Sequence, residues 1–303
     1  MRKEKPCFGS FPCWNWIKEE LIMERKIETQ VKGFHAIDGG GVHLVRVLGN
    51  TTVKAFNPFL MLDSFDSTNP EDYVACFPMH PHRGIETITF VAHGNMRHKD
   101  SMGFEDIVQD GEVQYMSAGS GILHEETIPA SPRMCGLQLW LNLPAKDKMT
   151  KPSYKAIKKN EIPEVPLIHG KVRVLMGNYE GTQGYQSHHL PLDYYDIHLD
   201  PGASLTWKVD RERAAMGFTL QGEVIVAGNV IPEKTAVRFT EGDTVTITAG
   251  KDPVEFMFMS SLELDDPIHW GGPIVMDTRE GLLTAFQELE TGTFLKDKMD
   301  VEK

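Results

Sequence analysis

Cysteine is scarce in this sequence, and no stretch of it is apolar enough to cross a bilayer. The 303 residues include only four cysteines (Cys7, Cys13, Cys76 and Cys135), and no two of them form a CxxC pair. A chain of this size can build its core without disulfides, so we expect these thiols to be reduced. Charged residues, Gly and Pro interrupt every apolar run before it reaches the ~18 residues that a transmembrane helix needs. Residues 1–27 also lack the continuous apolar segment of a signal peptide, so the sequence predicts a cytoplasmic protein.

Basic residues are outnumbered as well. The chain has 31 Lys and Arg against 43 Asp and Glu, which gives a net charge of −12. This charge repels nucleic-acid phosphates and anionic membrane surfaces at long range. The aromatic residues of "GSFPCWNWIKEEL" near the N-terminus have no basic stripe beside them, so they do not indicate base stacking. We therefore expect neither direct nucleic-acid binding nor membrane contact.

Short β-type segments dominate what is present. Segments such as "ETITFVAHG", "GLQLWLNLP", "YYDIHLDPG" and "DTVTITAG" are rich in β-branched and aromatic residues and end at Gly, Pro, Asn or Asp. Strands at such regular spacing favour a sandwich or barrel over alternating strands and helices. One helix is predicted near the C-terminus, where Asp277 and Glu280 form a capping-box pattern before apolar residues at helical spacing. The sequence predicts an all-β fold with a short C-terminal helix.

The chain also resembles itself internally. "DGEVQYMSAG" (110–119) and "EGDTVTITAG" (241–250) share an acidic opening, a β-type interior and glycines eight residues apart. A Lys- and Pro-rich stretch at 142–170 separates the two halves. We expect an N-terminal extension (1–27), two β-barrels (28–164 and 165–295) and a tail (296–303). Met1 and Met23 are both candidate translation starts.

Two clusters of polar residues carry the clearest chemical signal. His80 and His82 flank Pro81 in "HPHRGIET", and His124 and Glu126 stand in "GILHEE". Residues i and i+2 of a strand share a face, so each pair points one way. If the two strands are neighbours, three imidazoles and one carboxylate converge on a transition-metal site.

Ordinary histidines are the alternative interpretation of this pattern. An isolated HxH pair at a strand edge is also typical of surface or hydrogen-bonded histidines. The remaining histidines show no cluster of metal-binding spacing, and we expect surface or satisfied side chains at His43, His188, His189 and His198. His93 and His98 lie between the two motifs, where they are candidates for the rim of a barrel.

The combined pattern resembles the cupin superfamily and, more closely, the pirin family. The strings "HPHRGIET", "SAGSGILHEE", "GLQLWLNLP" and "GPIVMDT" carry this resemblance, which covers about residues 28–295. The resemblance implies a bicupin of two β-barrels with one metal in the N-terminal barrel. It also implies that the metal ligands are His80, His82, His124 and Glu126, and that Glu86 is not a ligand. We expect Arg83 and Glu86 to orient the ligand imidazoles, with a surface salt bridge as the alternative.

The C-terminal barrel is expected to lack an equivalent metal. When the glycines of the two halves are aligned, the four ligand positions correspond to Lys208, Asp210, Glu255 and Met257. Lysine and methionine cannot replace two of the four ligands.

The resemblance further implies an activity, a metal and an alternative role. Pirin-like proteins are associated with quercetin 2,3-dioxygenase activity, in which O₂ opens the central ring of a flavonol and carbon monoxide is released. Iron as Fe(II) is the favoured metal, although imidazole and carboxylate ligands also suit Mn, Ni, Co, Cu or Zn. In that activity, Glu126 would accept the proton of the flavonol hydroxyl. The alternative is a metal- or redox-responsive regulatory protein that contacts a transcription or metabolic partner.

Overall fold

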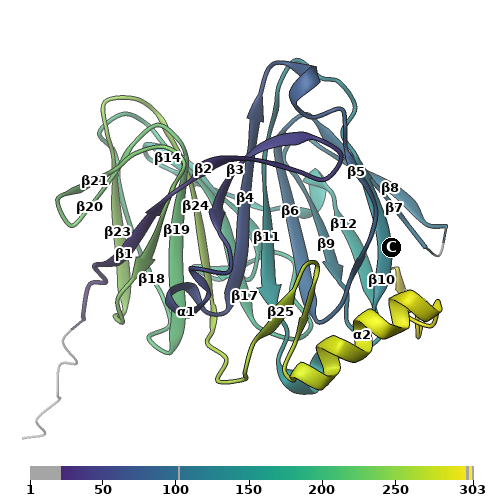
Figure 1. The fold of residues 1–303 in the computed structure, drawn as a ribbon. Coiled ribbons are helices and arrows are strands. Elements are labelled where there is room, and N and C mark those ends of the chain that lie inside the picture. Colours follow the sequence, from purple (N-terminus) through teal and green to yellow (C-terminus); the bar gives the residue numbers. More distant parts are fainter. Residues whose placement is uncertain (1–21, 102, 298–299, 302–303) are drawn as a thin grey trace, which may run out of the picture.

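The fold is built from two β-barrels that lie side by side (Figure 1). The computed structural model describes residues 22–101, 103–297, 300 and 301. Cys7 and Cys13 lie outside these residues, whereas Cys76 and Cys135 are free thiols. The α-helices of the described residues are α1 (Val53–Phe56) and α2 (Arg279–Thr291), and 3-10 turns occur at Pro70–Asp72, Ala145–Asp147 and Lys159–Glu161. None of the described helices has both the length and the apolar character needed to cross a bilayer. The predicted all-β bicupin with a short C-terminal helix is confirmed.

The N-terminal barrel consists of a large sheet and a smaller one. The eight strands of the large sheet are, in order, β2 (Phe34–Asp38), β3 (Val42–Leu48), β4 (Phe59–Ser67), β11 (Met134–Asn142), β6 (Ile85–His93), β9 (Glu112–Ser117), β12 (Ser153–Ile157) and β27 (Asp300–Val301). The four strands of the smaller sheet are β5 (Phe77–His82), β10 (Ile122–Thr127), β7 (Asn95–Asp100) and β8 (Glu105–Gln109). Both histidine motifs therefore lie in the smaller sheet.

The C-terminal barrel repeats this arrangement. Its large sheet has the order β1 (Ile27–Lys32), β22 (Thr235–Phe239), β19 (Arg213–Gln221), β24 (Val254–Leu262), β17 (Leu192–Leu199), β14 (Gly170–Met176) and β13 (Glu164–Leu167). Its smaller sheet has the order β18 (Ser204–Lys208), β23 (Thr244–Ala249), β20 (Val224–Val226) and β21 (Asn229–Ile231). Two short hairpins complete the fold, β15 (Asn178–Tyr179) with β16 (Thr182–Gln183) and β25 (His269–Gly271) with β26 (Ile274–Met276).

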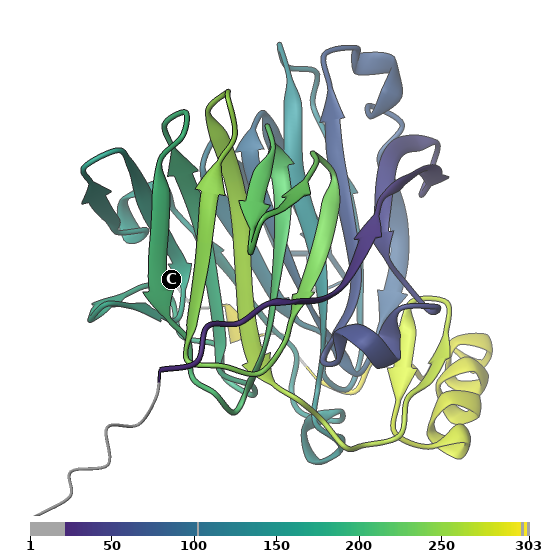
Figure 2. The same ribbon diagram turned by 90° about the vertical axis from the view of Figure 1, so that its left-hand side faces the viewer.

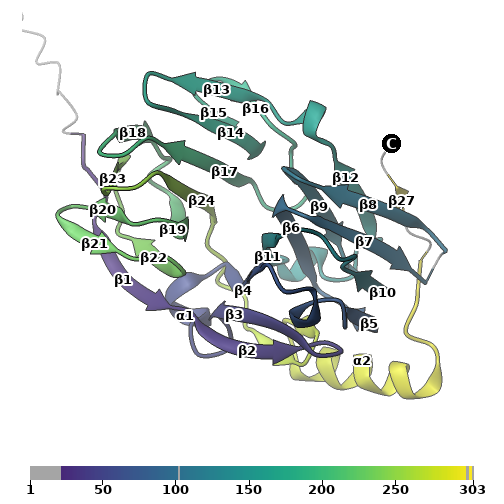
Figure 3. The same cartoon turned by 90° about the horizontal axis from the view of Figure 1, so that it is seen from above.

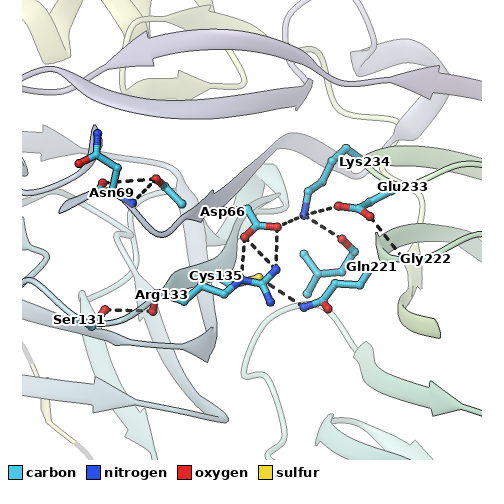
Figure 4. Close-up of polar contacts among 11 residues, drawn as sticks. Asp66, Asn69, Ser131, Arg133, Cys135, Gln221, Gly222, Glu233 and Lys234 are labelled. Carbon is cyan, nitrogen blue, oxygen red and sulfur yellow. Dashed lines mark hydrogen bonds and ion pairs between the residues drawn. The ribbon is translucent and has the colours of Figure 1, made fainter. Parts of the chain in front are cut away.

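The two large sheets face each other across an apolar layer (Figure 3). This layer joins side chains of both barrels, such as Leu137 and Leu139 of β11 with Tyr194 and Met257 of the other barrel. Apolar residues alternate along these strands, so one set fills the interface and the other fills the interior of each barrel. At one edge Asp66 joins the barrels by accepting bonds from Arg133 and, at 2.8 Å, from Lys234 (Figure 4).

Each end of the chain pairs with the barrel that the other half of the chain mainly forms. Strand β1 pairs with β22 of the C-terminal barrel, although the division at residue 164 would assign residues 28–32 to the N-terminal barrel. Figure 2 shows this segment running across the C-terminal barrel before the chain enters the other one. At the opposite end, β27 pairs with β12, so residues 300 and 301 of the expected tail form a strand.

The segment after the second barrel returns to the first one. The β25–β26 hairpin and α2 lie against the N-terminal barrel (Figure 1), and Arg83 forms a bridge with Ile274. A Cβ atom at Gly84 would lie only 2.0 Å from the carbonyl oxygen of Val275, so glycine permits this close approach. Helix α2 begins one residue later than the Asp277 capping pattern predicts, because the Thr278 side chain accepts the bond from the Gly281 N–H.

Candidate metal centre

Three imidazoles meet between β5 and β10. These strands are antiparallel neighbours, and His124 stands directly opposite His80. The possible ligand atoms of His80, His82 and His124 all lie within 4.8 Å of one another. His82 and His124 are buried, whereas His80 is half-buried at the edge of the barrel. The sequence motif and the i, i+2 rule predicted this convergence, and the antiparallel pairing of the two strands produces it.

Hydrogen bonds select the Nε2 atom of each ring of β5 as the ligand. His80 Nδ1 lies 2.8 Å from the Pro78 carbonyl oxygen, and His82 Nδ1 lies 3.0 Å from the Pro273 carbonyl oxygen. Because a carbonyl oxygen can only accept, both Nδ1 atoms carry a proton, and in the neutral rings both Nε2 atoms therefore keep a lone pair. The two Nε2 atoms face each other at 3.1 Å. Two lone pairs at this distance repel, and a cation between them would relieve the repulsion.

A chain of polar contacts selects the same atom in His124. His124 Nδ1 lies 3.3 Å from His98 Nδ1, and His98 Nε2 lies 3.3 Å from the carboxylate of Asp100. The carboxylate accepts from His98 Nε2, so His98 Nδ1 accepts in turn from His124 Nδ1. His124 Nε2 is then left with a lone pair, and this buried atom has no hydrogen-bond partner among the described residues. A buried acceptor without a partner is costly unless something binds it.

The electrostatics of the site favour the neutral form of the two buried imidazoles, His82 and His124. Burial, together with the neighbouring His80, lowers the pKa of His82 to about 3. Burial also lowers the pKa of His124 well below its usual value, with further contributions from His82 and His80. Neutral imidazole is the form that binds a metal ion.

Glu126 lies on the same strand as His124, but its carboxylate is held by two amides. Oε1 accepts from Gln114 at 2.6 Å and Oε2 accepts from Gln138 at 2.9 Å. A β-bulge separates His124 from Glu126, and the carboxylate is not part of the group whose ligand atoms lie within 4.8 Å of one another. The structure therefore places Glu126 two residues from His124 on β10, buried and with both carboxylate oxygens held by amide donors.

Arg83 and Glu86 make contacts away from the imidazoles. Arg83 donates to the carbonyl oxygens of Ser120 and Phe294, at 2.7 and 2.8 Å, and so holds the returning C-terminal segment. Glu86 is buried and accepts from the Tyr115 hydroxyl at 2.5 Å. The carbonyl groups of Pro78 and Pro273, together with His98, make the contacts with the imidazoles that we expected of Arg83 and Glu86.

Sequence reasoning missed several residues of the centre. His98 was expected only as a candidate for the rim, yet it is buried against His124, with 5.3 Å between the ring centroids. Its pairing with Glu126 across β7 and β10 is not visible in the polar segment "GNMRHKD". Gln114 and Gln138 could have been found only from the inward positions of β9 and β11. Pro273 is 191 residues from His82, and no local pattern connects them.

A cavity of about 550 Å³ opens onto His80 and His82. Its apolar wall includes Phe77, Trp140 and Trp270, and the two indole ring centroids are 5.9 Å apart. Trp270 belongs to the returning β25 strand, so the second half of the chain supplies part of this wall. The volume is in the range of pockets that hold a small aromatic molecule.

The residues present fit a divalent transition metal. Three imidazoles supply nitrogen ligands, and the buried Nε2 atom of His124, which has no partner among the described residues, carries a lone pair that a cation would satisfy. Glu126 lies two residues from His124 on β10, and an amide contact would have to be released before its carboxylate supplied an oxygen ligand. Such a donor set does not select one metal among Fe, Mn, Ni, Co, Cu and Zn.

Comparison with known proteins identifies the family. Residues 41–141 match the family model described as Pirin, and residues 194–295 match the family model described as the Pirin C-terminal cupin domain. A pirin-like protein of Caulobacter vibrioides is 40% identical over 274 residues, which cover 89% of this chain and 99% of that protein. A putative quercetin 2,3-dioxygenase of Pseudomonas aeruginosa is 35% identical over 271 residues, which cover 86% of this chain and 94% of that protein.

A solved structure shows the same architecture. The structure of quercetin 2,3-dioxygenase from Acinetobacter baumannii superposes with a TM-score of 0.82 at 29% identity, covering 89% of this chain and 98% of that chain. The chain belongs to the pirin family, as its sequence motifs predicted.

Proposed function

We propose that this member of the pirin family is a metal-dependent dioxygenase that acts on flavonols, as quercetin 2,3-dioxygenases do. Relatives that carry this name cover most of the chain. Three oriented imidazoles and a carboxylate, beside a cavity with two indole rings, suit a planar aromatic substrate and a metal that keeps open positions.

The orientation of the three imidazoles is the observation that carries this proposal. Each Nδ1 atom has a polar partner, which leaves the Nε2 atoms of His80, His82 and His124 for one ion. Three protein nitrogens fill only part of the coordination sphere of Fe(II), Mn(II) or Ni(II). With the metal bound by these three residues, the remaining positions would be open to substrate and O₂, and we favour Fe(II) as the metal.

The protein's own residues have two tasks in this reaction. When bound, the metal supplies Lewis acidity toward the flavonol 3-hydroxyl and redox chemistry toward O₂. Glu126 takes the proton of this hydroxyl onto a carboxylate oxygen, while Gln114 or Gln138 keeps the other oxygen in place. Trp140 and Trp270 contact the flat faces of the substrate and exclude water. O₂ then opens the central ring of the electron-rich flavonolate, and carbon monoxide leaves.

Aerobic turnover of quercetin by the Fe(II)-loaded protein tests the proposal. We expect loss of quercetin absorbance, consumption of O₂ and release of carbon monoxide. Glu126→Gln should keep the metal and lose most of the turnover. Glu125→Gln is the matched control, because Glu125 is next along β10 and lies 3.5 Å from Lys99 on the other face.

Two results would count against this function. If Glu126→Gln turns over quercetin at the rate of the unmodified protein, Glu126 is not the base. If fully loaded protein consumes neither quercetin nor O₂, the dioxygenase assignment fails. Metal-dependent capture of a partner protein by the same inactive sample would then support the regulatory alternative.

A further inference from the structure

A second group of potential ligands lies on the C-terminal barrel. Asp196 and His198 alternate along β17, and Glu255 of β24 stands directly opposite His198. The possible ligand atoms of these three residues lie within 4.8 Å of one another. Figure 3 shows β17 and β24 side by side in the wall of the C-terminal barrel. We propose that Asp196, His198 and Glu255 form a second divalent-cation site at the junction of the two barrels.

This site shares Glu255 with the counterpart that the sequence led us to exclude, but it lies outside the interior of the barrel. The interior of the C-terminal barrel is filled by apolar residues of the same strands, including Tyr195, Ile197 and Phe256. Because successive residues of a strand alternate, Asp196, His198 and Glu255 point away from that interior. They line a cavity of about 210 Å³ together with Phe90 and Gly111 of the N-terminal barrel.

Glu255 supplies the second carboxylate of this group. The residue is only 8% exposed, and the possible ligand atoms of Asp196, His198 and Glu255 lie within 4.8 Å of one another. A buried carboxylate is costly unless it is neutralised, and a divalent cation would neutralise it together with Asp196.

Asp196 has only part of its charge satisfied. Its Oδ2 atom accepts from Arg173 Nη1 at 3.0 Å. His198 Nε2 donates to the same Oδ2 atom at 3.0 Å. The buried Oδ1 atom, which also lies 3.0 Å from His198 Nε2, accepts no hydrogen bond from the described residues. Donor atoms at this separation match neighbouring ligands of one metal ion, whose bonds to nitrogen and oxygen are about 2.0–2.2 Å long. If a metal ion takes the place of the His198 proton, Arg173 remains on Oδ2, where it balances one of the two carboxylates.

The ligand types define the class of cation. One imidazole and two carboxylates suit Zn²⁺, Mn²⁺ or Fe²⁺ and leave positions for water from the cavity. The site does not depend on the proposed dioxygenase function, since it shares no residue with the first centre.

The number of metal ions per chain tests this proposal directly. Metal-free full-length protein would be titrated with Zn²⁺ by calorimetry, and the bound metal would be counted by elemental analysis after desalting. We expect two Zn²⁺ per chain, one of which is lost in His198→Ala and in Glu255→Gln. Both variants should keep the ion at the first centre, and His124→Ala should lose only that ion. His169→Ala is the matched control, because His169 is an exposed histidine of the same barrel and should leave two ions bound.

Each outcome of this titration decides the question. One Zn²⁺ per chain in the unmodified protein overturns the second site. Two ions that persist with unchanged affinity in both His198→Ala and Glu255→Gln overturn it as well. Glu255→Gln preserves the size of the side chain, so it remains informative if His198→Ala does not fold.

Discussion

The Nε2 atoms of His80 and His82 face each other at 3.1 Å, while the Nδ1 atom of each ring points at a backbone carbonyl oxygen. This relationship fixes the protonation of both rings before any metal arrives. The ligands of such a site do not have to reorient when the metal binds, so no free energy of binding is lost in that step. Part of the preparation comes from Pro273, which reaches the N-terminal barrel only because the chain returns after the second barrel.

Loss of the His98 contact should weaken metal binding. His98→Leu keeps a side chain of similar size but removes the acceptor that holds His124 Nδ1. Mutation of such a supporting contact typically costs 10–100-fold in metal affinity, and we expect a loss of that size at the first centre. Calorimetric titration of Zn²⁺ into the metal-free variant measures it. His35→Leu, at an exposed position of β2, should bind as tightly as the unmodified protein. Equal affinities for the two variants would show that His98 does not support the metal ligand His124.

Metal binding should stabilise the fold. A ligand that binds only the folded state adds about 2.7 kcal/mol at a free concentration of 100 Kd, so the midpoint of thermal unfolding should rise with metal concentration. Scanning calorimetry with and without EDTA measures this change. In His124→Ala the contribution of the first centre should disappear, because the variant lacks a ligand. A variant that gains as much stability as the unmodified protein would show that the ion binds elsewhere.

The buried carboxyl group of Glu86 should make stability depend on pH. Burial raises the pKa of Glu86 from 4.5 to about 7, so between these values the folded protein holds a proton that the unfolded chain releases. Stability contributed by this group is therefore complete below about pH 4.5 and is lost as the pH rises through 7. At pH 8, Glu86→Gln should be more stable than the unmodified protein. The difference in free energy of unfolding between the two proteins should shift in favour of the variant by about 1–3 kcal/mol between pH 4.5 and pH 8.

Urea denaturation in EDTA at both pH values measures the effect of Glu86→Gln. Glu125→Gln serves as the control, since Glu125 is half-buried beside Lys99 rather than enclosed. A difference between Glu86→Gln and the unmodified protein that is the same at pH 4.5 and pH 8 would contradict the raised pKa.

Removal of the Trp270 indole should weaken substrate binding more than it slows the chemical step. The ring centroids of Trp270 and Trp140 are 5.9 Å apart in the cavity wall. Trp140 contacts the ring of His82, whereas no such ring contact joins Trp270 to a ligand imidazole within the described residues. Trp270→Ala should raise the KM for quercetin several-fold and leave kcat nearly unchanged, while Trp270→Phe should restore most of the affinity. Steady-state kinetics with Fe(II)-loaded protein measures both constants. A fall in kcat alone would place Trp270 outside the binding wall.

The features of the site that were predictable from the sequence are those carried by short motifs within one strand. His80, His82 and His124 were predictable because each motif lies on one strand and the i, i+2 rule fixes its face. The number of barrels followed from the internal repeat. The exchange of β1 into the other barrel was not predictable, since its alternation suits either sheet. The partners of the ligands were also hidden, because His98 and Pro273 reach the site through strand pairing and chain return rather than through spacing.

An anomalous-difference map from crystals of Fe(II)-loaded protein tests the central claim most directly. We predict one strong peak about 2.1 Å from the Nε2 atoms of His80, His82 and His124, with each Nδ1 atom still bonded to its present partner. A peak beside the Nδ1 atoms, or a fully loaded protein whose iron lies away from these three rings, would contradict the account.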